Sequence, residues 1–341
     1  QGRIIVDKVT VPPGDPQLFE FDPSWTANFF LAHATAPHNS GFLAPGIYSV
    51  AELGPPVGWT LTSAVCSDGS AIGAINLAAG ETVTCTFTNT GQGRIIVDKV
   101  TVPPGAAQSF EFDPSWGVNF FLTHAAAPND SGLLNPGIYT VAELVPIGWT
   151  LTSAVCSDGS VIGNINLAAG ETITCTFTDT EQGRILVDKV TDPPLHPQLF
   201  EFNPSWPGAN FLLSDVSPLQ DSGPLNPGSY SVAELGPPAG WQLTSAVCSD
   251  GSSVNNIVLS AGETVTCTFT NTGRGDLLVF KYLDSNANGI YEPGLGESGL
   301  GGWQFRVVGP GFNGFVVTTG TGLYLLSSLA PGAYTVTETV Q

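Results

Sequence analysis

Basic residues are scarce in this sequence, and charged residues of any kind make up only 11% of its 341 residues. A typical soluble protein has about 25%. Nine lysines and arginines stand against 29 aspartates and glutamates, which gives a formal net charge of −20. A chain this acidic repels phosphate backbones, and it has no cluster of basic residues. We therefore expect no nucleic-acid partner.

Methionine and long apolar runs are also absent. No apolar run approaches the roughly 20 residues that cross a membrane, so we expect no membrane span. The sequence starts at Gln1 without a charged and then apolar leader. From this we expect an internal or processed part of a longer product.

What the chain has in abundance is 41 glycines and 27 prolines, and one unit that repeats. "QGRIIVDKVTVPPG" begins at Gln1 and recurs at Gln92, "QGRILVDKVTDPP" begins at Gln182, and "RGDLLVFKYLD" begins at Arg274. A period of this length fits a small domain and is too long for a solenoid repeat. The predicted domains are 1–91, 92–181, 182–273 and 274–341.

Each full repeat contains seven short segments rich in β-branched and aromatic residues, separated by Pro and Gly clusters. In the first repeat these segments are 3–9, 18–21, 28–32, 46–53, 59–66, 74–78 and 82–90. The pattern predicts an all-β protein made of tandem antiparallel, immunoglobulin-like β-sandwiches. Because the junctions are very short, we expect the domains to form an elongated rod.

The last domain, 274–341, lacks counterparts of segments 59–66 and 82–90 of the first repeat. We therefore expect an incomplete sandwich with an open edge and an open core. Two explanations remain open at this stage. Either the natural chain continues, or another copy supplies the missing strands and joins subunits head to tail.

Cysteine occurs twice in each full repeat, always with the same spacing. The repetition indicates one disulfide bond within each repeat, although a metal site or free thiols would also use cysteine. No histidine recurs near these residues, and disulfides imply an oxidising, extracellular compartment. The expected pairs are Cys66 with Cys85, Cys156 with Cys175, and Cys248 with Cys267.

Three blocks carry a family resemblance: "GRIIVDKVTVPPG…FEF", "APGIYSVAELGPPVGWTLTSAVC" and "LAAGETVTCTFTNT". In their order and spacing they resemble the prealbumin-like, SpaA- and Cna-B-type repeats of bacterial surface proteins. The last domain, with "KYLDSNANGIYEPGLGESGLGGWQF" and "LAPGAYTVTET", resembles the SdrD B-like relatives of that fold. The resemblance implies secreted or wall-attached stalks, pilins and adhesins without enzymatic turnover.

The resemblance also implies a role for the lysines, of which there is one in the first strand of each repeat. In many Cna-B domains this lysine forms an amide with an Asn or Asp of the last strand, assisted by a Glu. The matching residues are Lys8, Glu52 and Asn89; Lys99, Glu143 and Asp179; and Lys189, Glu234 and Asn271.

Strand alternation supports a shared location for these groups independently of the family. Lys8 falls on the same strand face as Ile4 and Val6, and Asn89 on the same face as Phe87. An unpaired charge buried there would be costly. Burial would lower the pKa of the lysine and raise that of the glutamate, which favours amide formation. Two alternatives to the amide bond remain open. The lysine and glutamate could form a buried ion pair, or the lysine could reach the surface beside Asp7.

"DSNANG" matches the start of a calcium-binding loop, in which alternating oxygens converge and a glycine permits the turn. The candidate Ca²⁺ ligands are Asp284, Asn286, Asn288, Ile290, Glu292 and Glu297. Leu295 stands where the closing acid should be, and a turn without an ion is the alternative.

From these observations we expect a structural subunit or segment of an extracellular fibre or stalk at the cell surface. It would associate with other copies of itself or with neighbouring repeats in a filament. An adhesin that binds host matrix or glycan through the rod is the alternative function, and an enzyme is not expected.

Overall fold

The computed structural model describes residues 1–339. The chain divides into two compact units, one of residues 1–181 and one that begins at Gln182. Strands dominate both units, and the described residues contain a single short 3₁₀ helix, Pro293–Leu295, and no other helix. No helix within residues 1–339 has the length and apolar character needed to cross a membrane.

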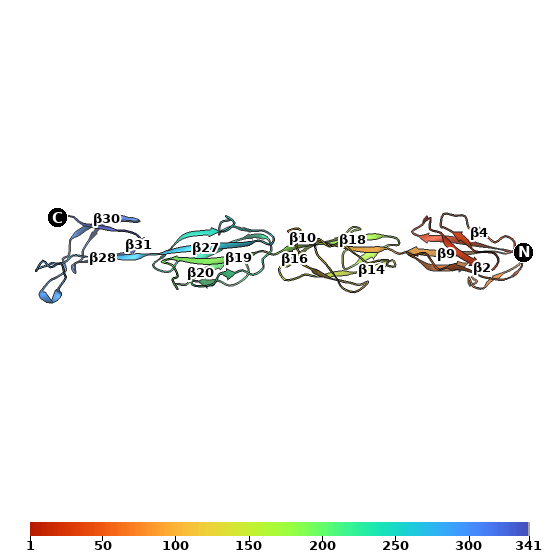
Figure 1. Cartoon of the computed structure of the whole chain (residues 1–341), viewed down its shortest axis with the longest axis horizontal. Coiled ribbons are helices and arrows are strands. Elements are labelled where there is room, and N and C mark those ends of the chain that lie inside the picture. The colour runs from red at the N-terminus through yellow and green to blue at the C-terminus, as the bar shows by residue number, and fades with distance from the viewer. Residues whose placement is uncertain (340–341) are drawn as a thin grey trace. The chain divides into compact units, whose positions relative to one another are not determined.

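Each full repeat is a two-layer sandwich of nine strands (Figure 1). In the first repeat, β4-β1-β9-β7 form the larger sheet, β3-β2-β6 form the smaller one, and β5 pairs with β8. The strands are β1 (Arg3–Val11), β2 (Phe19–Pro23), β3 (Phe29–Leu31), β4 (His38–Asn39), β5 (Gly46–Tyr48), β6 (Val50–Leu53), β7 (Trp59–Cys66), β8 (Ile75–Leu77) and β9 (Thr82–Gly91).

The second and third repeats have the same strand order and the same sheets. The second contains β10 (Arg94–Val102), β11 (Phe110–Pro114), β12 (Phe120–Leu122), β13 (Asn129–Asp130), β14 (Gly137–Tyr139), β15 (Val141–Leu144), β16 (Trp149–Cys156), β17 (Ile165–Leu167) and β18 (Thr172–Glu181). The third contains β19 (Arg184–Asp192), β20 (Phe200–Pro204), β21 (Phe211–Leu213), β22 (Gln220–Asp221), β23 (Gly228–Tyr230), β24 (Val232–Leu235), β25 (Trp241–Cys248), β26 (Ile257–Leu259) and β27 (Thr264–Gly273).

The last domain, drawn in blue in Figure 1, has fewer strands. They are β28 (Gly275–Phe280), β29 (Gln304–Gly309), β30 (Phe312–Val317), β31 (Leu323–Leu329) and β32 (Thr335–Glu338). Among the described residues, β28 pairs with β31 alone, and β30-β29-β32 form the second sheet.

The expectation of a purely antiparallel sandwich is wrong for one pair of strands in each repeat. β1 and β9 pair in parallel over nine residues, from Arg3 opposite Thr82 to Val11 opposite Thr90. Parallel neighbours require a long connection between them. Here the connection is the rest of the repeat, so the first and last strands of each sandwich lie side by side in the middle of one sheet.

Segment 46–53 was predicted as one strand and is instead two strands that belong to different sheets. β5 pairs with β8, whereas β6 pairs with β2. The break falls at Ser49, whose backbone N–H donates to the Ser24 hydroxyl oxygen (2.9 Å) and whose carbonyl accepts the Ser24 N–H (2.9 Å). These bonds replace the ladder at the point where the chain changes sheet.

Alternation along the strands builds the core. In β1, Ile4, Val6 and Lys8 are buried and the intervening residues are partly exposed. The first repeat buries Phe19 and Phe21 from β2 against Phe87 from β9, with Phe21 and Phe87 edge to face at 5.1 Å. The core of the last domain is much smaller and comprises Val279, Phe305, Val307 and Val316.

Candidate functional site

A buried lysine cluster occupies the same place in each full repeat, between the two sheets. The lysine lies on the first strand, the glutamate on the strand that follows the sheet change, and the Asn or Asp on the last strand. The structure therefore brings together all three residues predicted for each repeat. Lys8 is 2% exposed, which rules out the alternative in which it reaches the surface.

In the first repeat the Lys8 Nζ donates to the Asn89 side-chain oxygen at 2.5 Å and lies 3.3 Å from the Glu52 carboxylate. The Asn89 side-chain amide donates to the other Glu52 oxygen at 2.5 Å. The ammonium also lies 4.0 Å from the centre of the Phe19 ring. Burial lowers the pKa of Lys8, an effect that Glu52 partly offsets.

The third repeat has the same arrangement with slightly longer contacts. Lys189 donates to the Asn271 side-chain oxygen at 2.9 Å, and Asn271 donates to Glu234 at 2.6 Å. Lys189 and Glu234 are 3.9 Å apart. Burial lowers the pKa of Lys189 to about 8 and raises that of Glu234. Much of the amine is therefore neutral in mildly alkaline solution.

The second repeat differs because Asp179 takes the place of the asparagine. Lys99 contacts the Asp179 carboxylate and lies 3.0 Å from Glu143, and all three side chains are fully buried. One lysine thus faces two carboxyl groups. Burial, together with the neighbouring Asp179, raises the pKa of Glu143 to about 7, although Lys99 acts in the opposite direction. Glu143 is therefore about half protonated at neutral pH.

The aromatic ring beneath each lysine was missed by the sequence prediction. Phe110 and Phe200 repeat the contact that Phe19 makes, with the ammonium 4.0 and 4.1 Å from the ring centres. A cation over a ring face is stabilised by the ring quadrupole. The signal was the "FEF" motif, whose first phenylalanine points inward on the strand that faces the lysine.

Each full repeat also contains one disulfide bond, and the described cysteines include no free thiol. Cys66–Cys85, Cys156–Cys175 and Cys248–Cys267 each span 19 residues. In each pair the first cysteine ends an edge strand and the second lies directly opposite it on the last strand. The bond ties the edge strand to the strand that carries the Asn or Asp.

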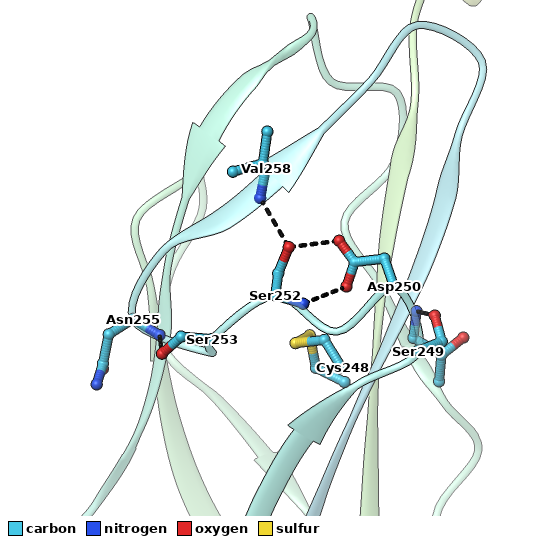
Figure 2. The surroundings of a disulfide bond; sticks show 9 residues. Cys248, Ser249, Asp250, Ser252, Ser253, Asn255 and Val258 are labelled. Atoms are coloured by element: carbon cyan, nitrogen blue, oxygen red, sulfur yellow. Dashed lines mark hydrogen bonds between the residues drawn. A yellow bond between two sulfur atoms is a disulfide. The ribbon is translucent and has the colours of Figure 1, made fainter.

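Figure 2 shows the turn that follows Cys248. Ser252 donates its N–H to Asp250 at 3.0 Å, its hydroxyl donates to the same carboxylate at 2.5 Å, and its oxygen accepts the Val258 N–H at 3.3 Å. Hydrogen bonds from Ser252 lower the pKa of Asp250. These hydrogen bonds hold the turn that leads from β25 to β26. They also satisfy the Asp250 carboxylate and the Ser252 hydroxyl within the turn.

The candidate calcium loop folds around its own hydrogen bonds. Asp284 accepts the Gly289 N–H at 2.8 Å, and the side-chain amides of Asn286 and Asn288 donate to Glu292 at 2.8 and 2.7 Å. Glu297 is 3% exposed, and its carboxylate accepts the backbone N–H groups of Ser285 and Glu292.

Only part of the predicted calcium ligand set is therefore brought together. The side chains of Asn286, Asn288 and Glu292 meet through the two amide N–H groups, while the Asn286 and Asn288 oxygens accept backbone N–H groups of the loop. Glu297 holds the loop backbone. No group of three or more His, Cys, Asp and Glu side chains suited to a metal occurs within residues 1–339.

The chain belongs to the family of prealbumin-like fold domains. The family model matches residues 4–91, 95–181 and 214–273, one segment in each full repeat. No curated protein matches the sequence.

Several solved structures resemble the chain at low identity. The Bacillus anthracis TIE protein is 19% identical over 80% of this chain, with a TM-score of 0.38, and the chain spans 51% of its length. BcpA, the major pilin subunit of Bacillus cereus, is 13% identical over 80% of this chain and 99% of its own, with a TM-score of 0.35. A streptococcal ancillary pilin is 14% identical over 72% of this chain and 89% of its own, with a TM-score of 0.26.

Proposed function

We propose that the chain is a structural segment of an extracellular surface fibre or stalk, and that each repeat carries tension along its length. The observation that carries this proposal is the parallel pairing of the first and last strands of each sandwich. Membership of the prealbumin-like family and the disulfide in each repeat support it. In a filament, the partners would be other copies of the chain or neighbouring repeats.

The direction of loading follows from the pairing. Tension reaches the first repeat through the N-terminal end of β1 and leaves it through the C-terminal end of β9. These two ends lie at opposite ends of one parallel pair nine residues long. Force along the chain therefore loads all hydrogen bonds of the pair together. Pulling β7 and β9 apart from the end where Trp59 stands opposite Gly91 would instead load their bonds one after another, because both forces then act at the same end of this antiparallel pair.

Single-molecule force spectroscopy tests the proposal by comparing these two directions. In one tether, force enters at Gln1 and leaves at Gln92. In the matched tether it enters at the exposed Val57, just before β7, and leaves at Gln92, which peels the edge strand. We expect the first geometry to withstand several times the force of the second. Equal forces in both directions would contradict a load-bearing role.

The lysine clusters would strengthen the same pair by an amide bond between its strands. The neutral Lys8 amine attacks the side-chain carbonyl carbon of Asn89, the new C–N bond forms, and the bond to the Asn89 side-chain nitrogen breaks. Glu52 transfers the proton from the amine to the nitrogen that departs as ammonia. In the second repeat the leaving molecule is water, because Asp179 replaces the asparagine. The 2.5 Å contact between Lys8 and Asn89 supports this step.

Calcium binding in the last domain is a separate part of the proposal. Asp284, Asn286, Asn288 and Glu292, with the Ile290 carbonyl, would hold the ion, which would then replace the hydrogen bonds from the two amides to Glu292. Bound Ca²⁺ would supply charge neutralisation within the loop and stiffen it. The meeting of the Asn286, Asn288 and Glu292 side chains supports this assignment.

A further inference from the structure

One edge of β1 faces away from β9 and is only partly covered by another strand. β4 pairs with this edge at Ile5 and Val6. Further along, the Thr10 N–H donates to the Nδ1 atom of the His33 ring at 2.8 Å. Thr10 is 1% exposed and stands opposite Asn89 of the lysine cluster, so this hydrogen bond closes the sheet edge beside the cluster.

The bond depends on the protonation state of the histidine. An imidazole nitrogen accepts a hydrogen bond only when it carries no proton, and a fully protonated ring has an N–H on both nitrogens. The His33 side chain is partly exposed, so protons from the solvent can reach it. Protonation would place an N–H of His33 against the N–H of Thr10 and leave a buried backbone donor without an acceptor, which is strongly unfavourable.

The repeats differ in the chemistry of this acceptor. In the second repeat the Thr101 N–H donates to the Nδ1 atom of His124 at 2.8 Å, as in the first. In the third, Asp215 takes the place of the histidine and accepts the Thr191 N–H at 3.3 Å, the Thr191 hydroxyl at 2.9 Å and the Leu195 N–H. Burial acts to raise the pKa of Asp215, but these hydrogen bonds lower it below its usual value. The carboxylate therefore still accepts where a histidine has become protonated.

The titratable groups on the elements around His33 each have another partner. They are Lys8 and Glu52 in the buried cluster, Asp7 bonded to the Lys8 N–H, Asp15 bonded to the Gln17 N–H, and Glu20 bonded to the Asn28 amide. None of the ion pairs within residues 1–339 includes His33 or His124. The lysine acts on this position, because Lys189 helps to lower the pKa of Asp215 in the third repeat. A charged ring would thus lack a paired carboxylate and would stand near a second positive charge.

We propose that His33 and His124 make the first two repeats sensitive to acid along this edge, and that Asp215 makes the third repeat resistant. As pH falls through the range in which histidine takes up a proton, the imidazole releases the backbone of the first strand, and the sheet edge beside the lysine cluster opens. The stability that this bond provides is present in neutral and alkaline solution and is lost in mild acid. The switch acts whether or not the cluster has formed an amide, so it does not depend on that reaction.

Hydrogen exchange of the whole chain at about pH 7.5 and about pH 5 tests the switch, since these values lie on either side of the ordinary histidine pKa. The segments to compare are 9–18, 100–109 and 190–199, each of which contains the threonine N–H. After correction for the intrinsic pH dependence of exchange, protection of the first two segments should fall about tenfold in acid, the loss expected for one buried hydrogen bond. The third segment should keep its protection.

Two exchanged variants separate the histidine from every other acid-dependent group. His33→Asp should make the first segment as resistant as the third while the second stays sensitive, and Asp215→His should make the third segment sensitive. The lysine clusters are unaltered in both chains, so an effect that follows the exchanged residue comes from the acceptor. Equal loss of protection in all three segments, no loss in the first two, or a His33→Asp chain whose first segment stays sensitive would overturn the proposal. So would an Asp215→His chain whose third segment stays resistant.

Discussion

Extension under force distinguishes an amide-linked repeat from one held by an ion pair. The perturbation is Glu52→Gln, which keeps the size of the side chain and removes the carboxylate that transfers the proton. Lys8 and Asn89 are 81 residues apart, and the disulfide between them encloses 19. An amide between Lys8 and Asn89 would prevent all of this chain from extending, because tension would pass directly from β1 to β9.

Without the amide, the first repeat can release the chain that lies outside the disulfide loop. That is about 60 residues, which at about 3.4 Å per residue is on the order of 200 Å. Reducing the disulfide should release roughly 60 Å more, from the same length per residue. In the linked state the same repeat should release almost nothing.

The assay pulls the whole chain from its ends and counts unfolding steps of this length. We expect no such step from the three full repeats of the unaltered protein, and one step in the Glu52→Gln chain. The second and third repeats, still linked, are the internal control. Intact mass gives an independent measure, since the substitution should restore one ammonia. Three steps of about 200 Å from the unaltered chain would refute the amide and leave only the non-covalent cluster.

The remaining predictions concern acid, metal and disulfide. In the unlinked second repeat, the pKa of Glu143 rises from 4.5 to about 7 on folding, so the stability that its neutral form provides is complete below pH 4.5 and is lost as pH rises through about 7. Asp179→Asn should flatten this dependence in thermal melts between pH 5 and 8, and an unchanged slope would contradict it. Chelation should lower the melting temperature of the last domain alone, and Asp284→Ala should abolish the effect; a melt insensitive to both would remove the calcium site. Replacing Cys66 and Cys85 by alanine should cost the first repeat about 3 kcal/mol, and unchanged hydrogen exchange in β7 would argue against this.

The sequence predicted the parts of the fold that repetition and alternation control. The three copies predicted that the same set of strands would recur in each repeat, and the alternation of Ile4, Val6 and Lys8 placed the lysine inside. Neither repetition nor alternation depends on whether neighbouring strands run parallel or antiparallel, so the parallel pairing of β1 with β9 was missed. The break at Ser49 was also missed, because it depends on hydrogen bonds to a residue 25 positions away rather than on a local Gly or Pro.

The candidate sites show the same limit. Residue identity was enough to select Lys8, Glu52 and Asn89, but not the Phe19 ring beneath the lysine. In the calcium loop, composition predicted six ligands without showing that Glu297 is occupied by backbone N–H groups. Those bonds arise from how the loop packs on the domain, which a linear motif does not describe.

The placement of the lysines has a consequence for digestion by proteases that cut after lysine. Three of the four lysines are buried in the full repeats, and each can reach a protease only when its sandwich opens. Lys281, with a quarter of its side chain exposed, is the exception. Cleavage after lysine in the folded chain would therefore begin in the last domain. A timed digest with a protease that cuts only after lysine would report how well each sandwich stays closed, because trypsin would also cut at the exposed Arg94 and Arg184.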